Sequence, residues 1–256
     1  MTTPQYGFAR RPTWIVGHVI ALVAIVAFVQ LGLWQLRRLE ERRTLNEAVT
    51  ARLDSTYRPF DEIIRVNGAD PEAVVWRRVE ITGTYALDDE VIVQGRSHRG
   101  QSGHHVATPL VRSDGTAVII NRGWVPIDVV GPPVVGAEPP DGEVTVRGII
   151  RESQARGSVG PVDPPTGVLE RVARVDVGRL QQQSDLALFG FYVDLESQEP
   201  PQAGGSPAPL GPPDLSEGPH FAYALQWFTF AGVVLVGYPL LLRRTADPHR
   251  RARRRR

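Results

Sequence analysis

Residues 219–244 read PHFAYALQWFTFAGVVLVGYPLLLRR, and this stretch decides how the 256-residue chain is organised. No formally charged side chain lies between Phe221 and Leu242, and two arginines close the stretch. At a rise of about 1.5 Å per residue the uncharged run spans roughly 30 Å, which matches the hydrocarbon core of a bilayer. A soluble core helix of this length would normally carry a polar face. The stretch therefore predicts a transmembrane helix over residues 220–242.

A second uncharged run, WIVGHVIALVAIVAFVQLGLWQL, covers residues 14–36. Its two tryptophans, Trp14 and Trp34, are about 30 Å apart on a helix, as expected for aromatic belts at both interfaces. A secretory signal peptide would have a shorter apolar core and a small-residue cleavage site. The run therefore predicts an uncleaved transmembrane helix after a short cytoplasmic segment, residues 1–13. Helix-favouring residues extend this helix to about Leu53.

Charge is divided unevenly along the chain. Residues 44–219 carry 25 acidic side chains and 15 arginines, whereas residues 243–256 carry eight arginines and one acid. Arginines beside a transmembrane helix mark its cytoplasmic side and contact anionic lipid, so we expect a basic cytoplasmic tail and no nucleic-acid partner. Four arginines between residues 37 and 43 favour the opposite orientation, but long translocated loops override such flanks. The prediction is a multi-pass protein of the cell membrane, with both termini cytoplasmic and the central domain extracytoplasmic.

The central residues, 37–196, predict one β-rich domain with a helical entry. The Arg58-Pro59 step ends the helical entry, and short strands are expected after it. Apolar residues alternate at Val79, Ile81 and Tyr85, and further short β-branched runs, among them Val172 to Val177, are separated by turn signals such as Ser-Asp-Gly. A short helix is expected near residues 178–186, and a surface loop at residues 131–142. Residues 197–219 are rich in proline and glycine and predict an extended tether. The fold class is thus α+β: two transmembrane helices flanking one mainly antiparallel sheet with little helix.

Soluble catalytic signatures are absent from the sequence: there is no phosphate-binding loop, dinucleotide fingerprint, nucleophile elbow or zinc-protease motif. The chain has no cysteine, which excludes disulfides and thiolate metal sites. Three histidines, His98, His104 and His105, lie in GRSHRGQSGHH, where a metal site is one interpretation and a solvated loop between strands is the favoured one. We therefore predict no catalytic residue, no metal ligand and no enzymatic activity.

The motif NRGWVP, residues 121–126, ends a predicted strand. Arg122 and Trp124 are candidates for a partner-contact surface. The alternative is a structural corner, in which Gly123 permits an unusual backbone angle and Pro126 stops strand pairing.

His220 heads an aromatic stripe on the second predicted transmembrane helix. At 100° per residue it shares one face with Tyr223, Ala224, Trp227 and Ala231. Such a face could accept a flat hydrophobic ligand such as haem, with His220 as the axial ligand. The alternative is an interfacial histidine above an ordinary aromatic helix–helix seam.

The predicted topology places His220 at the outer interface, level with Trp34 and Gln35, which are further partner-contact candidates. His18 lies near the opposite interface and has no predicted function.

These features together resemble the Surfeit locus protein 1 family, whose members are membrane factors for assembly of cytochrome c oxidase. Five motifs in a fixed order between two terminal helices carry the resemblance: LGLWQLRR (31–38), Arg78-Val79 with Gly83, Thr108-Pro109-Leu110, NRGWVP (121–126) and HFAYALQWF (220–228).

The resemblance implies an extracytoplasmic β-domain and a part in maturing oxidase subunit I. It also implies haem a as a transiently bound cofactor, held through His220 with Tyr223 and Trp227 nearby, and the haem a synthesis machinery as a partner. Two alternatives remain open: a scaffold that stabilises subunit I without touching haem, and a membrane-tethered hydrolase or metalloenzyme using the His98–His105 loop.

Overall fold

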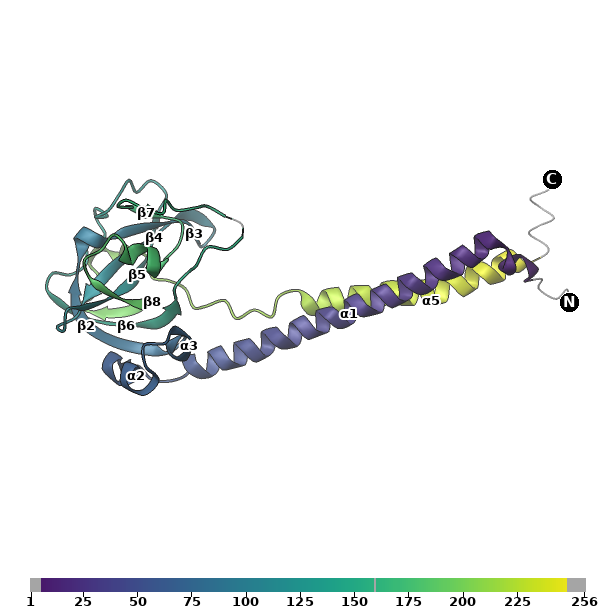
Figure 1. Cartoon of the computed structure of the whole chain (residues 1–256), viewed down its shortest axis with the longest axis horizontal. Helices are drawn as coiled ribbons and strands as arrows, with labels where there is room; N and C mark the ends of the chain where they lie inside the picture. The colour runs from purple at the N-terminus through teal and green to yellow at the C-terminus, as the bar shows by residue number, and fades with distance from the viewer. Residues whose placement is uncertain (1–5, 159, 248–256) are drawn as a thin grey trace. The chain divides into compact units, whose positions relative to one another are not determined.

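The computed structural model describes residues 6–158 and 160–247 (Figure 1). The arginines of the predicted basic tail beyond residue 247 lie outside the described residues, as do the first five residues of the predicted N-terminal segment. The elements, in chain order, are η1 (Gly7–Arg10), α1 (Pro12–Leu53), β1 (Arg58–Pro59), α2 (Phe60–Asn67), α3 (Pro71–Val74), β2 (Arg78–Tyr85), η2 (Leu87–Asp89), β3 (Val91–His98), β4 (Gln101–Val111), β5 (Thr116–Pro126), β6 (Glu143–Glu152), β7 (Arg171–Val172), α4 (Val177–Gln181), β8 (Ala187–Glu199), η3 (Ala203–Gly205) and α5 (His220–Ala246).

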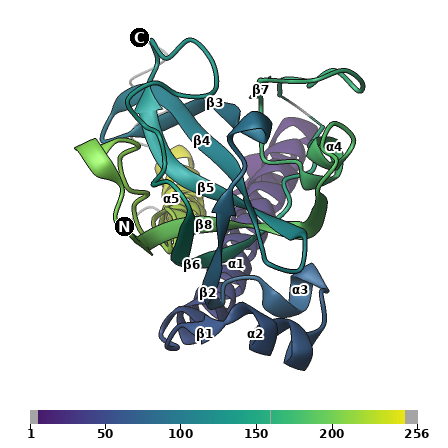
Figure 2. The ribbon, with the colours of Figure 1, turned by 90° about the vertical axis from the view of Figure 1, so that its left-hand side faces the viewer.

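The eight strands form one sheet in the order β1-β2-β6-β8-β5-β4-β3-β7, which confirms the predicted mainly antiparallel sheet (Figure 2). The pairs β1–β2, β3–β7 and β5–β8 are parallel, and the remaining pairs are antiparallel. An additional pairing of β2 with β4 closes β2, β6, β8, β5 and β4 into a ring of five strands. Closure removes free strand edges from the centre of the sheet.

The two faces of the ring bury different residues because side chains alternate along each strand. On β5, Val118 and Ile120 join the principal core inside the ring. Their neighbour Ile119 points outward into a second apolar cluster, where it packs with Tyr192 of β8 and Leu180 of α4. The outer face of the sheet is therefore covered by apolar packing in the region of α4.

Three local expectations were wrong. The segment after residue 59 forms the helices α2 and α3 before the sheet begins. The predicted strand from Val172 to Val177 is reduced to the two residues of β7, since α4 already starts at Val177. The run from His98 to His105 forms the β3–β4 hairpin and not a solvated loop between strands.

Two helices, α1 and α5, are long and apolar enough to cross a membrane. They pack side by side and antiparallel. Gln35, near the middle of α1, contacts His220, the first residue of α5, and His18, near the start of α1, contacts Tyr238 near the C-terminal end of α5. The small residues Ala224 and Ala231 are buried in this pair. Most of the apolar side chains on both helices are exposed, as expected for helices that contact lipid.

Close packing of α1 on α5 depends on Gly32. A Cβ atom at this position would lie 2.7 Å from two ring atoms of Phe228, which is too close without a shift of the ring or of a helix. We expect Gly32→Leu to lower the thermal unfolding temperature of the detergent-solubilised protein. Gly237→Leu on α5 is the matched control, because no atom lies within 4 Å of a Cβ there. Equal unfolding temperatures for the two variants would contradict this packing.

Candidate functional site

His220 is the first residue of α5, and one of its ring nitrogens is already engaged. Its Nδ1 lies 2.8 Å from Oε1 of Gln35. Because an amide oxygen can only accept, Nδ1 carries a proton, and in the neutral imidazole the lone pair is then on Nε2. Within the described residues Nε2 makes no hydrogen bond, and a neutral imidazole oriented through its other nitrogen is the form that binds metals.

The other histidine of this helix pair, His18, has both nitrogens occupied. Tyr238 donates its hydroxyl proton to Nδ1 at 2.7 Å, and Nε2 donates to the carbonyl of Ala9 at 3.1 Å. A histidine with both nitrogens satisfied has no lone pair left for an iron atom. His220 and His18 thus differ in whether a ring nitrogen has a free lone pair.

The aromatic candidates around His220 lie in two different environments. Trp227 stacks on Phe28 of α1 with ring centroids 5.8 Å apart, so it belongs to the seam between the helices. Tyr223 and Trp34 are both 47% exposed and remain available to a ligand or partner. Gln35 is buried beneath His220, where it orients the imidazole.

Polar contacts fix the chain just before α5 to the extension of α1. Arg43 forms a two-pronged ion pair with Glu217, with N–O distances of 2.8 and 2.9 Å. Asn46 donates to the carbonyl of Leu215 at 2.6 Å. Exposed ion pairs add little stability, so the main effect of these contacts is geometric: they limit where His220 can lie.

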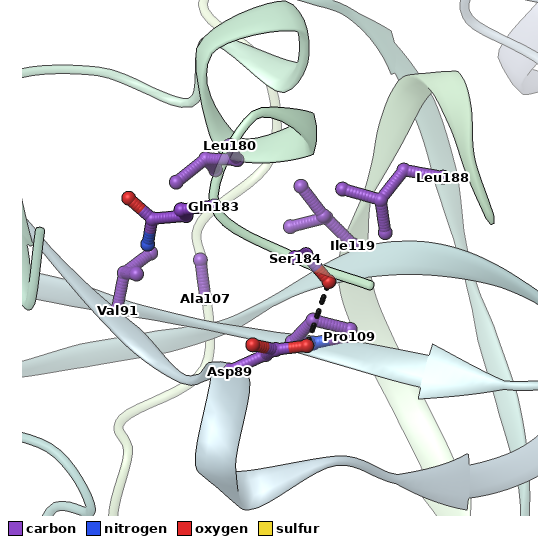
Figure 3. Close-up of a pocket in the computed structure, with 9 residues that line it drawn as sticks. All are labelled: Asp89, Val91, Ala107, Pro109, Ile119, Leu180, Gln183, Ser184 and Leu188. Atoms are coloured by element: carbon purple, nitrogen blue, oxygen red, sulfur yellow. Dashed lines mark hydrogen bonds between the residues drawn. The ribbon is translucent and has the colours of Figure 1, made fainter. Parts of the chain in front are cut away.

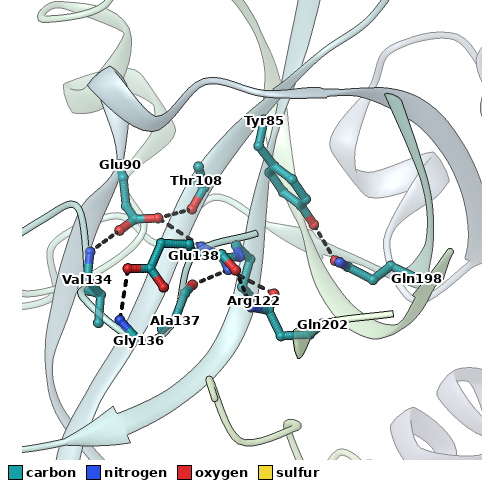
Figure 4. Close-up of polar contacts among 10 residues, drawn as sticks. All are labelled: Tyr85, Glu90, Thr108, Arg122, Val134, Gly136, Ala137, Glu138, Gln198 and Gln202. Carbon is teal, nitrogen blue, oxygen red and sulfur yellow. Dashed lines mark hydrogen bonds and ion pairs between the residues drawn. The ribbon is translucent and has the colours of Figure 1, made fainter. Parts of the chain in front are cut away.

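Arg122 is not at the surface: only 2% of the residue is exposed. Figure 4 shows its polar contacts. Its guanidinium forms an ion pair with Glu90 at 2.9 Å and donates to the carbonyl of Ala137 and to Oε1 of Gln202. Glu90 also accepts from the backbone N–H of Val134 at 2.9 Å. The pair therefore fixes the proline-rich loop 131–142 and the start of the 197–219 segment to the sheet. These contacts give Arg122 a structural function.

Trp124 is also largely buried, at 7% exposure. Its ring stacks on His98, with centroids 5.5 Å apart, and its backbone pairs with Ala208. Gly123 has φ +138°, and a Cβ there would lie 2.4 Å from the carbonyl oxygen of Ala208. The NRGWVP motif thus has the geometry of the structural corner, which also holds the returning segment.

The histidines of the β3–β4 hairpin are held by neighbouring side chains. His104 is buried and accepts from Nη2 of Arg171 at 2.9 Å. His105 accepts at Nδ1 from the amide of Asn121 at 3.2 Å. Among the described residues, no group of three or more His, Cys, Asp or Glu side chains is arranged to hold a metal ion.

Burial, together with the nearby Arg96 and His98, lowers the pKa of His105 to about 4. The unfolded chain binds a proton near pH 6.5, whereas the folded state resists protonation until about pH 4. The contribution of His105 to stability is therefore constant above pH 6.5 and falls as the pH drops from 6.5 to 4. We expect His105→Gln to remove up to about 3 kcal/mol of this pH dependence. Urea unfolding of both proteins at pH 7.5 and pH 4.5 measures the difference, and identical pH dependence would contradict it.

One small hole lies between α4 and the sheet (Figure 3). Its volume is about 10 Å³, and Ser184 donates to Asp89 at its edge at 2.7 Å. This is room for about one water molecule, so the hole is a packing feature and not a ligand site.

The fold and the His220 site define a class of protein: in the sequence, a β-sheet domain lies between two long apolar helices, and the second helix begins with a histidine whose Nε2 makes no hydrogen bond within the described residues. Comparison with known proteins gives the family. Residues 22–232 match the model of the SURF1 family, and the chain therefore belongs to that family.

Two bacterial relatives are similar along most of their length, and a yeast relative is similar over a part of its length. An uncharacterized SURF1-like protein of Mycobacterium tuberculosis is 28% identical over 238 residues, covering 91% of this chain and 85% of the relative. A SURF1-like protein of Rickettsia felis is 23% identical over 231 residues, covering 88% and 96%. The cytochrome oxidase assembly protein SHY1 of Saccharomyces cerevisiae is 30% identical over 150 residues, covering 57% of this chain and 38% of SHY1.

Proposed function

We propose that this protein is a membrane-anchored assembly factor for cytochrome c oxidase that holds haem a and passes it to subunit I. Family membership and the similarity to SHY1 support the assembly function. The observation that carries haem binding is the open Nε2 of His220, oriented by Gln35. Haem a supplies an iron centre that an imidazole nitrogen can bind, and its flat ring suits an apolar helix pair at the membrane interface.

The residues present fit such a ligand. His220 offers the axial nitrogen, and the exposed rings of Tyr223 and Trp34 offer apolar contact. Trp227 supports this surface from behind through its contact with Phe28. The act is binding and release, so the protein needs no catalytic group. We place both ends of the chain in the cytoplasm and the β-domain outside the cell membrane, where subunit I and the haem a synthesis machinery are the partners.

A scaffold that stabilises subunit I without binding haem is the rival function. Haem a content per subunit I, measured in oxidase purified from a deletion strain, separates the two. Delivery predicts subunit I with depleted haem a, restored by the wild-type gene. Normal haem occupancy with poor association of the other subunits would establish the scaffold and overturn delivery.

The hydrolase alternative has less support from the hairpin histidines. His105 receives its hydrogen bond from Asn121, a neutral amide that cannot stabilise a charged imidazolium as a carboxylate would. Its pKa near 4 also places it far from the range in which a general base works best at neutral pH.

Gln35 gives a sharper test of the haem site. Replacing it with leucine removes the acceptor that holds the proton on Nδ1 but leaves His220 in place. We expect Gln35→Leu to weaken haem a binding by about 10–100-fold, as for other groups that orient a metal-binding histidine. Gln226→Leu on α5 is the control, and haem titration of the detergent-solubilised proteins gives the affinities. Unchanged affinity in Gln35→Leu would show that the hydrogen bond is not used.

A further inference from the structure

Three hydrogen-bonded side chains cross the outer face of the sheet away from the cluster under α4. Asn121 on β5 donates through Nδ2 to Nδ1 of His105 on β4 at 3.2 Å and to Oδ1 of Asp194 on β8 at 2.8 Å. Asn121 and Asp194 are direct partners in the parallel β5–β8 pairing. Ile119 and Tyr192, two residues earlier on the same strands, are covered by apolar packing. The face thus changes from apolar to polar where α4 no longer covers it.

Asn121 is 4% exposed, and its Oδ1 has no hydrogen-bond partner within the described residues. A buried acceptor without a partner costs folding free energy, so a core selected for stability alone would pair it or replace it with an apolar side chain. This oxygen is also closed to solvent, so it lowers the stability of the face and is not a contact for a ligand in the groove.

These side chains line a groove of about 530 Å³ in the β-domain, a volume within the range of ligand sites. Its walls come from β3, β4, β5, β6 and β8 and from the proline-rich segment near Pro212. The polar lining residues that bear on recognition are Arg96, His105, Asn121, Arg151, Asp194 and Glu196. Glu196 forms an ion pair with Arg78 at 3.2 Å.

Charge is balanced around Arg151 and not around Arg96. Arg151 lies 3.5 Å from Asp194 and is neutralised by it. Arg96 has no carboxylate within 4.0 Å among the described residues, and its Nη2 donates only to Gln154 and to the carbonyl of Ala173. A half-buried cation without a counter-charge is costly, and burial lowers the pKa of Arg96 for this reason. The Arg96 end is therefore suited to an anion.

His105 adds a neutral donor beside this cation. Because its Nδ1 accepts from Asn121, its proton is on Nε2. The groove thus presents a guanidinium and an imidazole N–H as donors. A carboxylate could accept a hydrogen bond from each of them.

We propose that the groove binds a carboxylate, as an acidic side chain or C-terminus of a peptide presents it, with the Arg96 guanidinium as the cation and the Nε2–H of His105 as the second donor. The apolar lining by Ile149 and Leu210 and the openness of the groove suit an extended peptide more than a compact ion. This site lies in the β-domain and does not depend on haem binding at His220.

The test uses the full chain in nanodiscs on an array of random octapeptides. One set contains an Asp or Glu, and its matched set carries Asn or Gln at the same position. We expect the acidic set to bind at least about tenfold more tightly, a difference typical of one charge-assisted contact. Arg96→Gln abolishes this preference, whereas Arg147→Gln, which removes an exposed cation paired with Glu80 outside the groove, retains it.

A second variant avoids changing a half-buried side chain. Ser97 is exposed at the rim of the groove, so Ser97→Glu places a competing carboxylate beside Arg96 and is expected to weaken acidic peptides selectively. Competition by N-acetylaspartate distinguishes a small acid from a peptide as the ligand. If N-acetylaspartate competes as strongly per carboxylate as the peptides do, the ligand is a small amide-bearing acid. If it competes weakly, the ligand is a peptide. Equal binding of the acidic and amide sets, or a preference that survives both Arg96→Gln and Ser97→Glu, would overturn the proposal.

Discussion

Replacing Arg122 with alanine is expected to lower the free energy of unfolding of the β-domain by about 3–5 kcal/mol, the usual cost of removing one partner of a buried ion pair. Glu90 would keep a charge that is almost fully desolvated, with both side chains only 1% exposed. It would retain hydrogen bonds from Thr108 at 2.7 Å and from the N–H of Val134, but neither supplies a positive charge. Removing the guanidinium also breaks its hydrogen bonds to Ala137 and Gln202.

Urea unfolding of the detergent-solubilised protein, followed by protease resistance of the β-domain, measures this loss. Arg147→Ala is the matched control, because its ion pair with Glu80 is solvent-exposed and is expected to contribute less than about 1 kcal/mol. The double variant Glu90→Leu with Arg122→Met should recover part of the stability, since it removes the uncompensated charge. If Arg122→Ala lowers the free energy of unfolding by less than about 1 kcal/mol, the Arg122–Glu90 pair is not what holds loop 131–142 and the start of the 197–219 segment on the sheet.

The second large effect concerns oxidase assembly. His220→Ala removes the only candidate axial nitrogen in the described part of the helix pair that is free to bind iron. We expect cells carrying this variant to lose cytochrome c oxidase activity by roughly tenfold or more, as when a metal site loses a direct ligand. The abundance of the variant itself should be unchanged, because the hydrogen bond to Gln35 lies at a helix start and not in the β-domain core.

His18→Ala is the control for that experiment. It removes the other histidine of the same helix pair, which is satisfied by Tyr238 and Ala9. Activity close to wild type in His18→Ala together with loss in His220→Ala is the expected pattern. Full activity in His220→Ala at normal abundance would contradict a function for the imidazole.

The two apolar helices and the strand-rich middle could be predicted from the sequence because hydropathy and period-2 alternation are local signals. The helices α2 and α3 could not be predicted, since they follow an Arg58-Pro59 step and are short. Closure of the sheet through β2 and β4 depends on contacts between distant residues, and no local pattern reports it.

The functional residues also divide into those that the sequence could reveal and those that depend on contacts between distant residues. His220 could be found because a histidine at the edge of an apolar run is visible in the sequence, but its hydrogen bond to Gln35 joins residues 185 positions apart. The sequence left Arg122 open between a partner-contact surface and a structural corner, because its partner Glu90 is 32 positions away. The groove was missed altogether: Asn121 and Asp194 are each ordinary polar residues in a strand, and only the sheet register places them side by side. The one available signal was a polar residue directly after the apolar run 117–120.

The most direct test of the account is the absorption spectrum of the purified full-length protein after co-expression with haem a synthesis. We expect haem a to co-purify with the wild type and with His18→Ala, and to be lost from His220→Ala. A wild-type protein that purifies without haem a, or a His220→Ala variant that retains as much as the wild type, would contradict ligation by His220.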